Sequence, residues 1–195
     1  MDTFAVERKI FLKKSRVKGL ALAAILAALT AATGGISIPL PFTPVPITLQ
    51  VFFVYLAGCL AGPIYGALSM LLYLTIGALG LPVFSRFGAG LGHIIGPTGG
   101  YLLAFPIAAL VNGLITFNRS KSLQSEYGKV LCGMLLSLVV IYLIGVSWLS
   151  TYLHKPFVET FLIGGLPFIP VDLLKMVVAA PIAVRLRKDL ASILR

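Results

Sequence analysis

The chain has 195 residues, of which 58% are apolar and 11% are charged, and it carries a net charge of +10. Because an ordinary soluble domain has roughly 25% charged residues, this composition excludes a soluble globular protein and indicates an integral membrane protein. With roughly 20 residues needed for each membrane-spanning helix, the length allows about six spans with short connections.

The predicted fold is an all-α membrane protein with six transmembrane helices. We expect one integral membrane domain over residues 1–195, with a short basic cytoplasmic segment at residues 1–16. The connection between the second and third spans is little more than Gly62-Pro63, at which proline interrupts a helix. The six spans are predicted, in chain order, at residues 17–36, 47–62, 64–82, 98–117, 129–151 and 161–184.

Two connections on the outer side are long and chemically unusual. Residues 34–46 contain four prolines, which favour an extended backbone. Residues 82–97 contain four glycines around Arg86 and His93, a composition that allows close approach to a ligand. Both segments are fairly apolar, so we expect them to cover the helix ends as a lid over a site open to the outside. His93 has no Cys, His or acidic neighbour at ligand spacing, which favours a loop residue over a metal ligand.

The basic residues are distributed unevenly, and this distribution predicts the topology. Six of them precede the first apolar run, three surround the polar break after the fourth span, and four lie near the C-terminus, so thirteen of the sixteen Lys and Arg residues share one side. By the positive-inside rule, both termini are cytoplasmic. The basic surplus therefore sets orientation and attracts anionic membrane lipid, and it is not a sign of nucleic-acid binding.

The candidate site is a pair of opposite charges within the sixth apolar run. Asp172 and Lys175 are three residues apart, so on a helix they lie on one face. Each charge costs roughly 2.5–3.5 kcal/mol at the centre of an isolated membrane helix, and such charges usually face a polar cavity. The sixth span runs from outside to inside, which places the pair in its outer half, beneath the predicted lid. The alternative is a structural ion pair that anchors a helix end.

Small residues recur at every fourth position of the first span, for example at Ala24 and Ala28. Such a smooth face serves either packing within the chain or docking to another membrane subunit, and periodicity alone does not choose between them. The chain lacks a phosphate-binding loop and the common hydrolase motifs, so we expect neither an enzyme nor ATP hydrolysis by this chain, and no metal or cofactor.

The order and spacing of five motifs resemble the BioY family over nearly the whole chain. They are Ile36-Ser37-Ile38-Pro39-Leu40-Pro41, Pro44-Val45-Pro46-Ile47-Thr48-Leu49-Gln50, Gly80-Leu81-Pro82-Val83-Phe84, Gly96-Pro97-Thr98-Gly99-Gly100-Tyr101-Leu102 and Phe168-Ile169-Pro170-Val171-Asp172-Leu173-Leu174-Lys175. The resemblance implies a biotin-binding S component of an energy-coupling factor (ECF) transporter in the cell membrane. It also implies two kinds of partner, a transmembrane coupling subunit (T component) that docks at Ala24 and Ala28, and two cytoplasmic ATPase subunits.

The residue chemistry fits biotin, which has a carboxylate, an apolar tail and a ureido ring with two N–H donors and a carbonyl. Lys175, with Arg86, can pair with the carboxylate, and Asp172 can accept from a donor. Neutral hydrogen bonds are available from Gln50, Thr48 and Tyr101. Two other functions are consistent with these residues: a stand-alone secondary carrier of a small organic anion with Asp172 as its proton site, and a membrane scaffold whose charged pair is structural.

Overall fold

The computed structural model describes residues 3–118, 120 and 122–193, and the side chains of residues 16–118, 120 and 122–190. The predicted basic segment 1–16 therefore lies almost entirely outside the described side chains. The bundle consists of five long helices: α1 (Thr3–Ala32), α2 (Gln50–Ala78), α4 (Gly99–Thr116), α5 (Leu123–Leu153) and α7 (Ile169–Ile193). Shorter elements complete the fold: β1 (Ser37–Leu40), β2 (Thr43–Thr48), η1 (Ser85–Phe87), α3 (Leu91–Ile94), α6 (Phe157–Gly164) and η2 (Leu166–Phe168).

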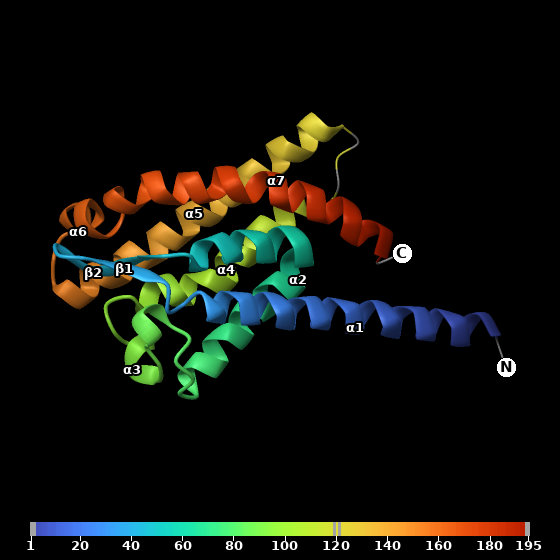
Figure 1. Cartoon of the computed structure of the whole chain (residues 1–195), viewed down its shortest axis with the longest axis horizontal. Coiled ribbons are helices and arrows are strands. Elements are labelled where there is room, and N and C mark those ends of the chain that lie inside the picture. The colour runs from blue at the N-terminus through green and yellow to red at the C-terminus, as the bar shows by residue number, and fades with distance from the viewer. Residues whose placement is uncertain (1–2, 119, 121, 194–195) are drawn as a thin grey trace.

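The molecule has two distinct ends. The strands, α3 and α6 gather at one end, which we call the strand end, while the start of α1 and the end of α7 lie at the other, the terminal end (Figure 1). This arrangement agrees with the prediction that the longer connections lie together on one side. The predicted sixth span, residues 161–184, is divided: η2 separates α6 from α7. Pro170 is the second residue of α7, where the absence of its N–H costs no helical hydrogen bond.

Helix α2 is a hairpin of two antiparallel arms. Gly62 has φ 75° and ψ −173°, outside the helical region, and Pro63 follows it. Gln50 Nε2 donates a hydrogen bond to the hydroxyl of Tyr73, which is 23 residues away; in a straight helix these residues would be roughly 34 Å apart. The predicted turn at Gly62-Pro63 is therefore confirmed, inside what is otherwise one continuous helical element.

The strand end is built from the proline-rich segment and the glycine-rich segment. Strands β1 and β2 pair antiparallel, with Ser37 opposite Thr48. The extended backbone predicted for residues 34–46 is therefore confirmed at residues 37–40 and 43–46, whereas residues 34–35 and 41–42 form turns. Proline lacks a donor and is tolerated here because a two-stranded ribbon has a free edge on each strand. The backbone N–H of Arg86, in η1, donates to Ser37 Oγ at 3.2 Å and joins the two segments.

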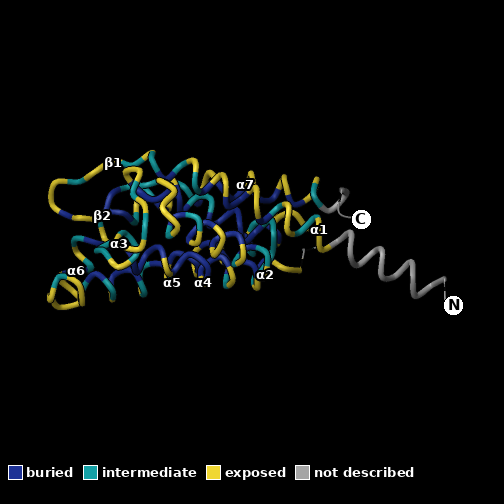
Figure 2. The backbone as a smooth tube through the Cα atoms, turned by 90° about the horizontal axis from the view of Figure 1, so that it is seen from below, coloured by how far each residue is buried: buried dark blue, intermediate teal, exposed yellow. Residues whose placement is uncertain are grey.

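Burial follows the requirements of a membrane. Helix α4 lies between α2 and α5 and contributes residues with no exposed surface, including Ala104, Ala108 and Asn112. Outward-facing side chains such as Leu114, Leu143 and Leu174 are large, apolar and more than half exposed, a pattern suited to lipid. Figure 2 shows the buried backbone in the middle of the bundle, with exposed positions along its outside and at the strand end.

Within the described residues, four helical segments are long and apolar enough to cross a membrane: Gln50–Ala78, Gly99–Thr116, Leu123–Leu153 and Phe157–Leu190. The first of these contains both arms of α2. The mostly helical, multi-pass membrane architecture predicted from the sequence is confirmed at this level.

Candidate functional site

A cavity lies inside the half of the bundle nearer the strand end, beneath β2. Its volume of about 60 Å³ exceeds the roughly 10–15 Å³ that one water molecule needs, so it is more than a packing defect. Residues of β2, α2, α4, α5 and α7 form its wall, together with Ser85 from the second outer connection, Thr98 just before α4, Gly164 of α6 and Phe168 of η2. Apolar lining residues include Val45, Ile47, Val51, Leu102, Phe105, Ile141, Phe168 and Val171.

The charged part of the cavity is the Asp172–Lys175 pair at the start of α7. Lys175 Nζ lies 2.7 Å from Asp172 Oδ1, and the side chains of Lys175 and Asp172 are only 10% and 7% exposed. Asp172 also lies in the first turn of α7, where the helix dipole favours a negative charge. The local spacing predicted this contact correctly, because residues three apart share one helix face.

A residue that the sequence analysis missed completes this group. The hydroxyl of Tyr142, on α5, donates to Asp172 Oδ2 at 2.6 Å. Each carboxylate oxygen of Asp172 therefore has one donor, Lys175 on one side and Tyr142 on the other. The sequence held a weak indication of a special role for Tyr142. It lies in the middle of a span, away from the membrane interface where tyrosines are enriched.

Gln50 lines the cavity, and hydrogen bonds to neighbouring segments hold its side chain in place. Its Nε2 donates to the Tyr73 hydroxyl and to the carbonyl oxygen of Val83, the latter at 3.4 Å. The Tyr73 hydroxyl donates to the same carbonyl at 3.3 Å, and the ring of Phe84 packs edge-on against Tyr73 with centroids 5.5 Å apart. The two arms of α2 and the second outer connection are thereby held together around Gln50.

Tyr101 and Thr48 also line the cavity, from α4 and from the end of β2. The Tyr101 hydroxyl donates to the Gly164 carbonyl at 2.7 Å, which ties α4 to the end of α6. Five of the six predicted ligand residues thus border one cavity: Thr48, Gln50, Tyr101, Asp172 and Lys175. That they bind a ligand stays a prediction.

Arg86 is the sixth predicted ligand residue, and the structure places it elsewhere. It is exposed on η1, outside the residues that line the cavity, with φ 58° in the left-handed region. Its neighbour Ser85 does line the cavity. The sequence correctly predicted that Arg86 lies in a loop next to the cavity. It could not predict where the side chain points, because on an irregular turn that direction depends on tertiary contacts.

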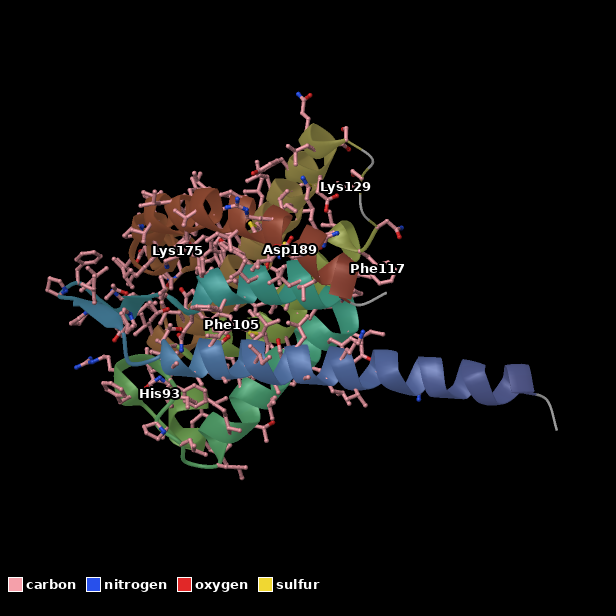
Figure 3. The ribbon with its side chains drawn as sticks, turned by 45° about the vertical axis from the view of Figure 1, so that its right-hand side comes forward. His93, Phe105, Phe117, Lys129, Lys175 and Asp189 are labelled. Atoms are coloured by element: carbon pink, nitrogen blue, oxygen red, sulfur yellow. The ribbon has the colours of Figure 1, made fainter. Side chains whose placement is uncertain are left out.

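His93 belongs to the loop structure, in agreement with its predicted role. Its ring stacks on Phe84 with centroids 5.2 Å apart, and its Nε2 lies 3.4 Å from Ser85 Oγ. Partial burial lowers the pKa of His93 below its usual value, so the neutral ring is favoured. Among the described residues, no three His, Cys, Asp or Glu side chains group as metal ligands would. Figure 3 shows His93 and Lys175 on the side of the bundle nearer the strand end, and Lys129 and Asp189 toward the opposite end.

The small residues of α1 separate into two rows. Ala23 and Ala27 are buried against the bundle, whereas Ala24 and Ala28 are exposed. The first row therefore serves internal packing. The second row leaves a smooth, uncovered strip on the outside of α1.

A second buried ion pair lies toward the terminal end, and sequence reasoning did not find it. Arg187 Nε donates to Glu126 Oε1 at 2.8 Å, and Arg187 also donates to the carbonyl oxygens of Cys59 and Thr116. Arg187 and Glu126 are 61 residues apart, and both lie in segments that were interpreted as cytoplasmic polar ends. Their pairing leaves no local pattern in the sequence.

Apolar helices packed around a cavity that contains a buried ion pair define a multi-pass membrane protein with an internal charged site. The BioY family model matches residues 7–192, and the chain belongs to the BioY family. The predicted family membership is therefore confirmed.

Relatives support this over most of the chain. A protein named "Probable biotin transporter BioY" from Pyrococcus horikoshii is 46% identical over 173 residues, covering 88% of this chain and 98% of the relative. "Biotin transporter BioY" from Thermotoga maritima is 42% identical, covering 85% and 94% of the two chains. A crystal structure of the S-component for biotin from an ECF-type ABC transporter superposes with a TM-score of 0.79 at 32% identity, over 89% of this chain and 92% of that one.

Proposed function

We propose that this protein captures biotin as the S component of an ECF-type ABC transporter for vitamin uptake. The observation that carries the proposal is the buried Asp172–Lys175 pair in a cavity of a BioY-family chain. Relatives named as biotin transporters give the substrate, and the structural relative gives the transporter class.

The cavity lining is complementary to a ligand that has a polar group at each end and an apolar part between them. Asp172 can accept from the N–H groups of the ureido ring, and Lys175 can pair with a carboxylate or donate to a carbonyl. Thr48, Gln50 and Tyr101 add neutral polar groups, and the apolar wall suits the valeryl chain and the thioether ring. Arg86 lies on the adjoining loop, from which it reaches the carboxylate only if the loop moves inward. No chemistry on biotin is required, so the chain is not an enzyme.

The proposed membrane arrangement has six crossings: α1, the two arms of α2, α4, α5 and α7. Both termini are cytoplasmic, which puts the strand end outside, where biotin enters beneath the lid. The basic residues near the terminal end face anionic lipid in the cytoplasmic leaflet.

Transport requires partners that supply energy. The exposed strip at Ala24 and Ala28 docks on the transmembrane T component, because small residues allow two helices to approach closely. Two cytoplasmic ATPase subunits hydrolyse ATP, for which this chain has no motif. Concentrative uptake of biotin into liposomes by this chain alone, without ATP, would contradict the partner-dependent model.

The test of capture is isothermal titration of biotin into the purified protein in detergent. Tight binding is expected for the parent, and Asp172→Ala and Lys175→Ala should each weaken it at least tenfold, or about 1.4 kcal/mol. Lys155→Ala is the matched control, since Lys155 is an exposed lysine outside the cavity lining. Absence of binding by a folded parent would remove the biotin assignment.

A further inference from the structure

A groove opens between α5 and α7 at the terminal end of the bundle. The two helices cross, and the start of α5 stands apart from α7 at this end (Figure 1). The groove has a volume of about 470 Å³ and shares no lining residue with the cavity near the strand end. Leu123 and Tyr127 of α5 border it on one side, and residues of α7 between Pro181 and Asp189 border it on the other. We call it the α5–α7 groove.

Two cations line this groove without a charged partner among the described residues. Arg185 and Lys188 are exposed and lie three residues apart, so they share one face of α7. Neither belongs to an ion pair within the described part of the chain. The lining also contains Asp189, which offsets one of the two positive charges, so the groove remains positive. Arg187, between the two cations in sequence, is instead buried and neutralised by Glu126.

The rest of the groove is apolar, and this surface continues along both helices. A row of side chains at intervals of four residues forms a ridge on a helix, and one such row starts in the groove on each helix. The helical rise of 1.5 Å per residue gives the longer row a length of about 18 Å, comparable with the roughly 15 Å depth of one membrane leaflet. The rows consist of exposed or half-buried side chains: Leu123, Tyr127, Leu131 and Leu135 on α5, and Ile182, Val178 and Leu174 on α7.

A positive groove that leads into two apolar rows matches a phospholipid with a net negative charge. Arginine and lysine both donate to phosphate oxygens, and Tyr127 adds a hydroxyl to the lining. The acyl chains of the same lipid can cover the rows, which belong to helices apolar enough to cross a membrane. A free phosphate ion would leave the rows uncovered. A cytoplasmic protein would reach the groove but not the part of the rows that lies within the membrane.

We propose that the α5–α7 groove binds an anionic phospholipid, with its phosphate held by Arg185 and Lys188 and its acyl chains along the two rows. The site is separate from the cavity and does not depend on which solute the protein captures. In the orientation proposed above it lies in the cytoplasmic leaflet, whose surface is negative because of its anionic lipids. A lipid bound there contacts both helices and stabilises their packing at the terminal end.

The test is a titration of phosphatidylglycerol into the purified full chain in a neutral detergent, with the melting temperature as the readout. A ligand that binds only the folded state raises this temperature in a concentration-dependent way, which gives an apparent affinity. Phosphatidylcholine with the same acyl chains and inorganic phosphate are titrated in parallel. Phosphatidylglycerol should raise the melting temperature of the parent, and the other two should leave it unchanged.

The variant that tests the groove is the double substitution Arg185→Gln with Lys188→Gln. In detergent alone it should melt with the parent, because both side chains are exposed and outside the ion pairs of the described structure. Its apparent affinity for phosphatidylglycerol should fall about tenfold or more, since each basic residue near an anionic surface contributes about a factor of five. The matched control, Arg16→Gln with Lys155→Gln, removes the same two kinds of charge from exposed positions outside the groove. It should respond to phosphatidylglycerol as the parent does.

The proposal is overturned by an unchanged response of the groove variant, by an equal loss in the control, or by an equal rise with phosphatidylcholine. An equal rise with inorganic phosphate would identify a simple anion site and would also overturn it. So would a parent that does not respond to phosphatidylglycerol at all. None of these measurements uses biotin, so a failure of the proposed function is a separate result.

Discussion

At the scale of single residues, Arg187 donates to two carbonyl groups that have no donor within their own helices, one of them at the hairpin in α2. Pro63 has no N–H, so the carbonyl of Cys59, four residues earlier, has no helical donor. Thr116 ends α4, and its carbonyl is likewise left free at the helix terminus. Arg187 donates to both carbonyls, and its charge is balanced by Glu126. One guanidinium therefore joins α2, α4, α5 and α7.

Replacement of Arg187 should consequently be severe. Arg187→Ala leaves the Glu126 carboxylate and two carbonyls without this donor, and removal of one partner from a buried ion pair costs about 3–5 kcal/mol. We expect a marked fall in the unfolding temperature of the purified protein in detergent. The control is Arg185→Ala, which removes an exposed arginine from the same helix and should change stability by about 0.5 kcal/mol or less. Equal melting of the two variants would show that the network contributes nothing to stability.

At the scale of elements, α4 approaches the hairpin of α2 through a glycine. A Cβ added to Gly113 would lie 2.4 Å from the backbone nitrogen of Pro63 and 2.5 Å from its Cα. These are backbone atoms, so the contact is relieved only if one helix shifts. The small residue therefore sets the distance between α4 and the turn that divides α2.

Two glycine substitutions should accordingly have opposite effects. Gly113→Ala forces α4 away from α2 and should destabilise the protein by about 1–3 kcal/mol, the usual range for overpacking. Gly128→Ala, within α5, meets nothing within 4 Å and should stabilise it by about 0.5–1 kcal/mol through helix propensity. Unfolding temperatures in detergent measure both. A stabilising effect of Gly113→Ala would mean that the two helices do not pack as closely as described.

At the scale of the whole molecule, contacts local in sequence were predictable and distant ones were not. Asp172 and Lys175 are three residues apart on one helix, so their pairing followed from helical geometry. The turn at Gly62-Pro63 followed from the chemistry of proline. By contrast, Tyr142 is 30 residues from Asp172, and only tertiary packing brings the two together. The extended strands were anticipated from their prolines, but the break between α6 and α7 was not.

The last prediction concerns the orientation of the protein in the membrane, and it follows from the positions of the strand end and the terminal end. The start of α1 and the end of α7 lie at the same end of the bundle, opposite the strands (Figure 1). In the sequence, thirteen of the sixteen basic residues belong to the N-terminal segment, the connection between the fourth and fifth predicted spans and the C-terminal segment, so this end should face the cytoplasm. The cavity then lies in the outer half of the membrane, as uptake of an external solute requires.

Single cysteines at the two ends test this orientation. Gln124 and Lys155 are exposed near opposite ends of α5, and they would be replaced by cysteine, one at a time, in a Cys132→Ser background; Cys59 is buried and should not react. A membrane-impermeant maleimide applied to intact cells should label Lys155→Cys, and it should label Gln124→Cys only after lysis. The reverse pattern would place the strand end inside the cell. The cavity would then open toward the compartment that an uptake system supplies, and capture of external biotin would be excluded.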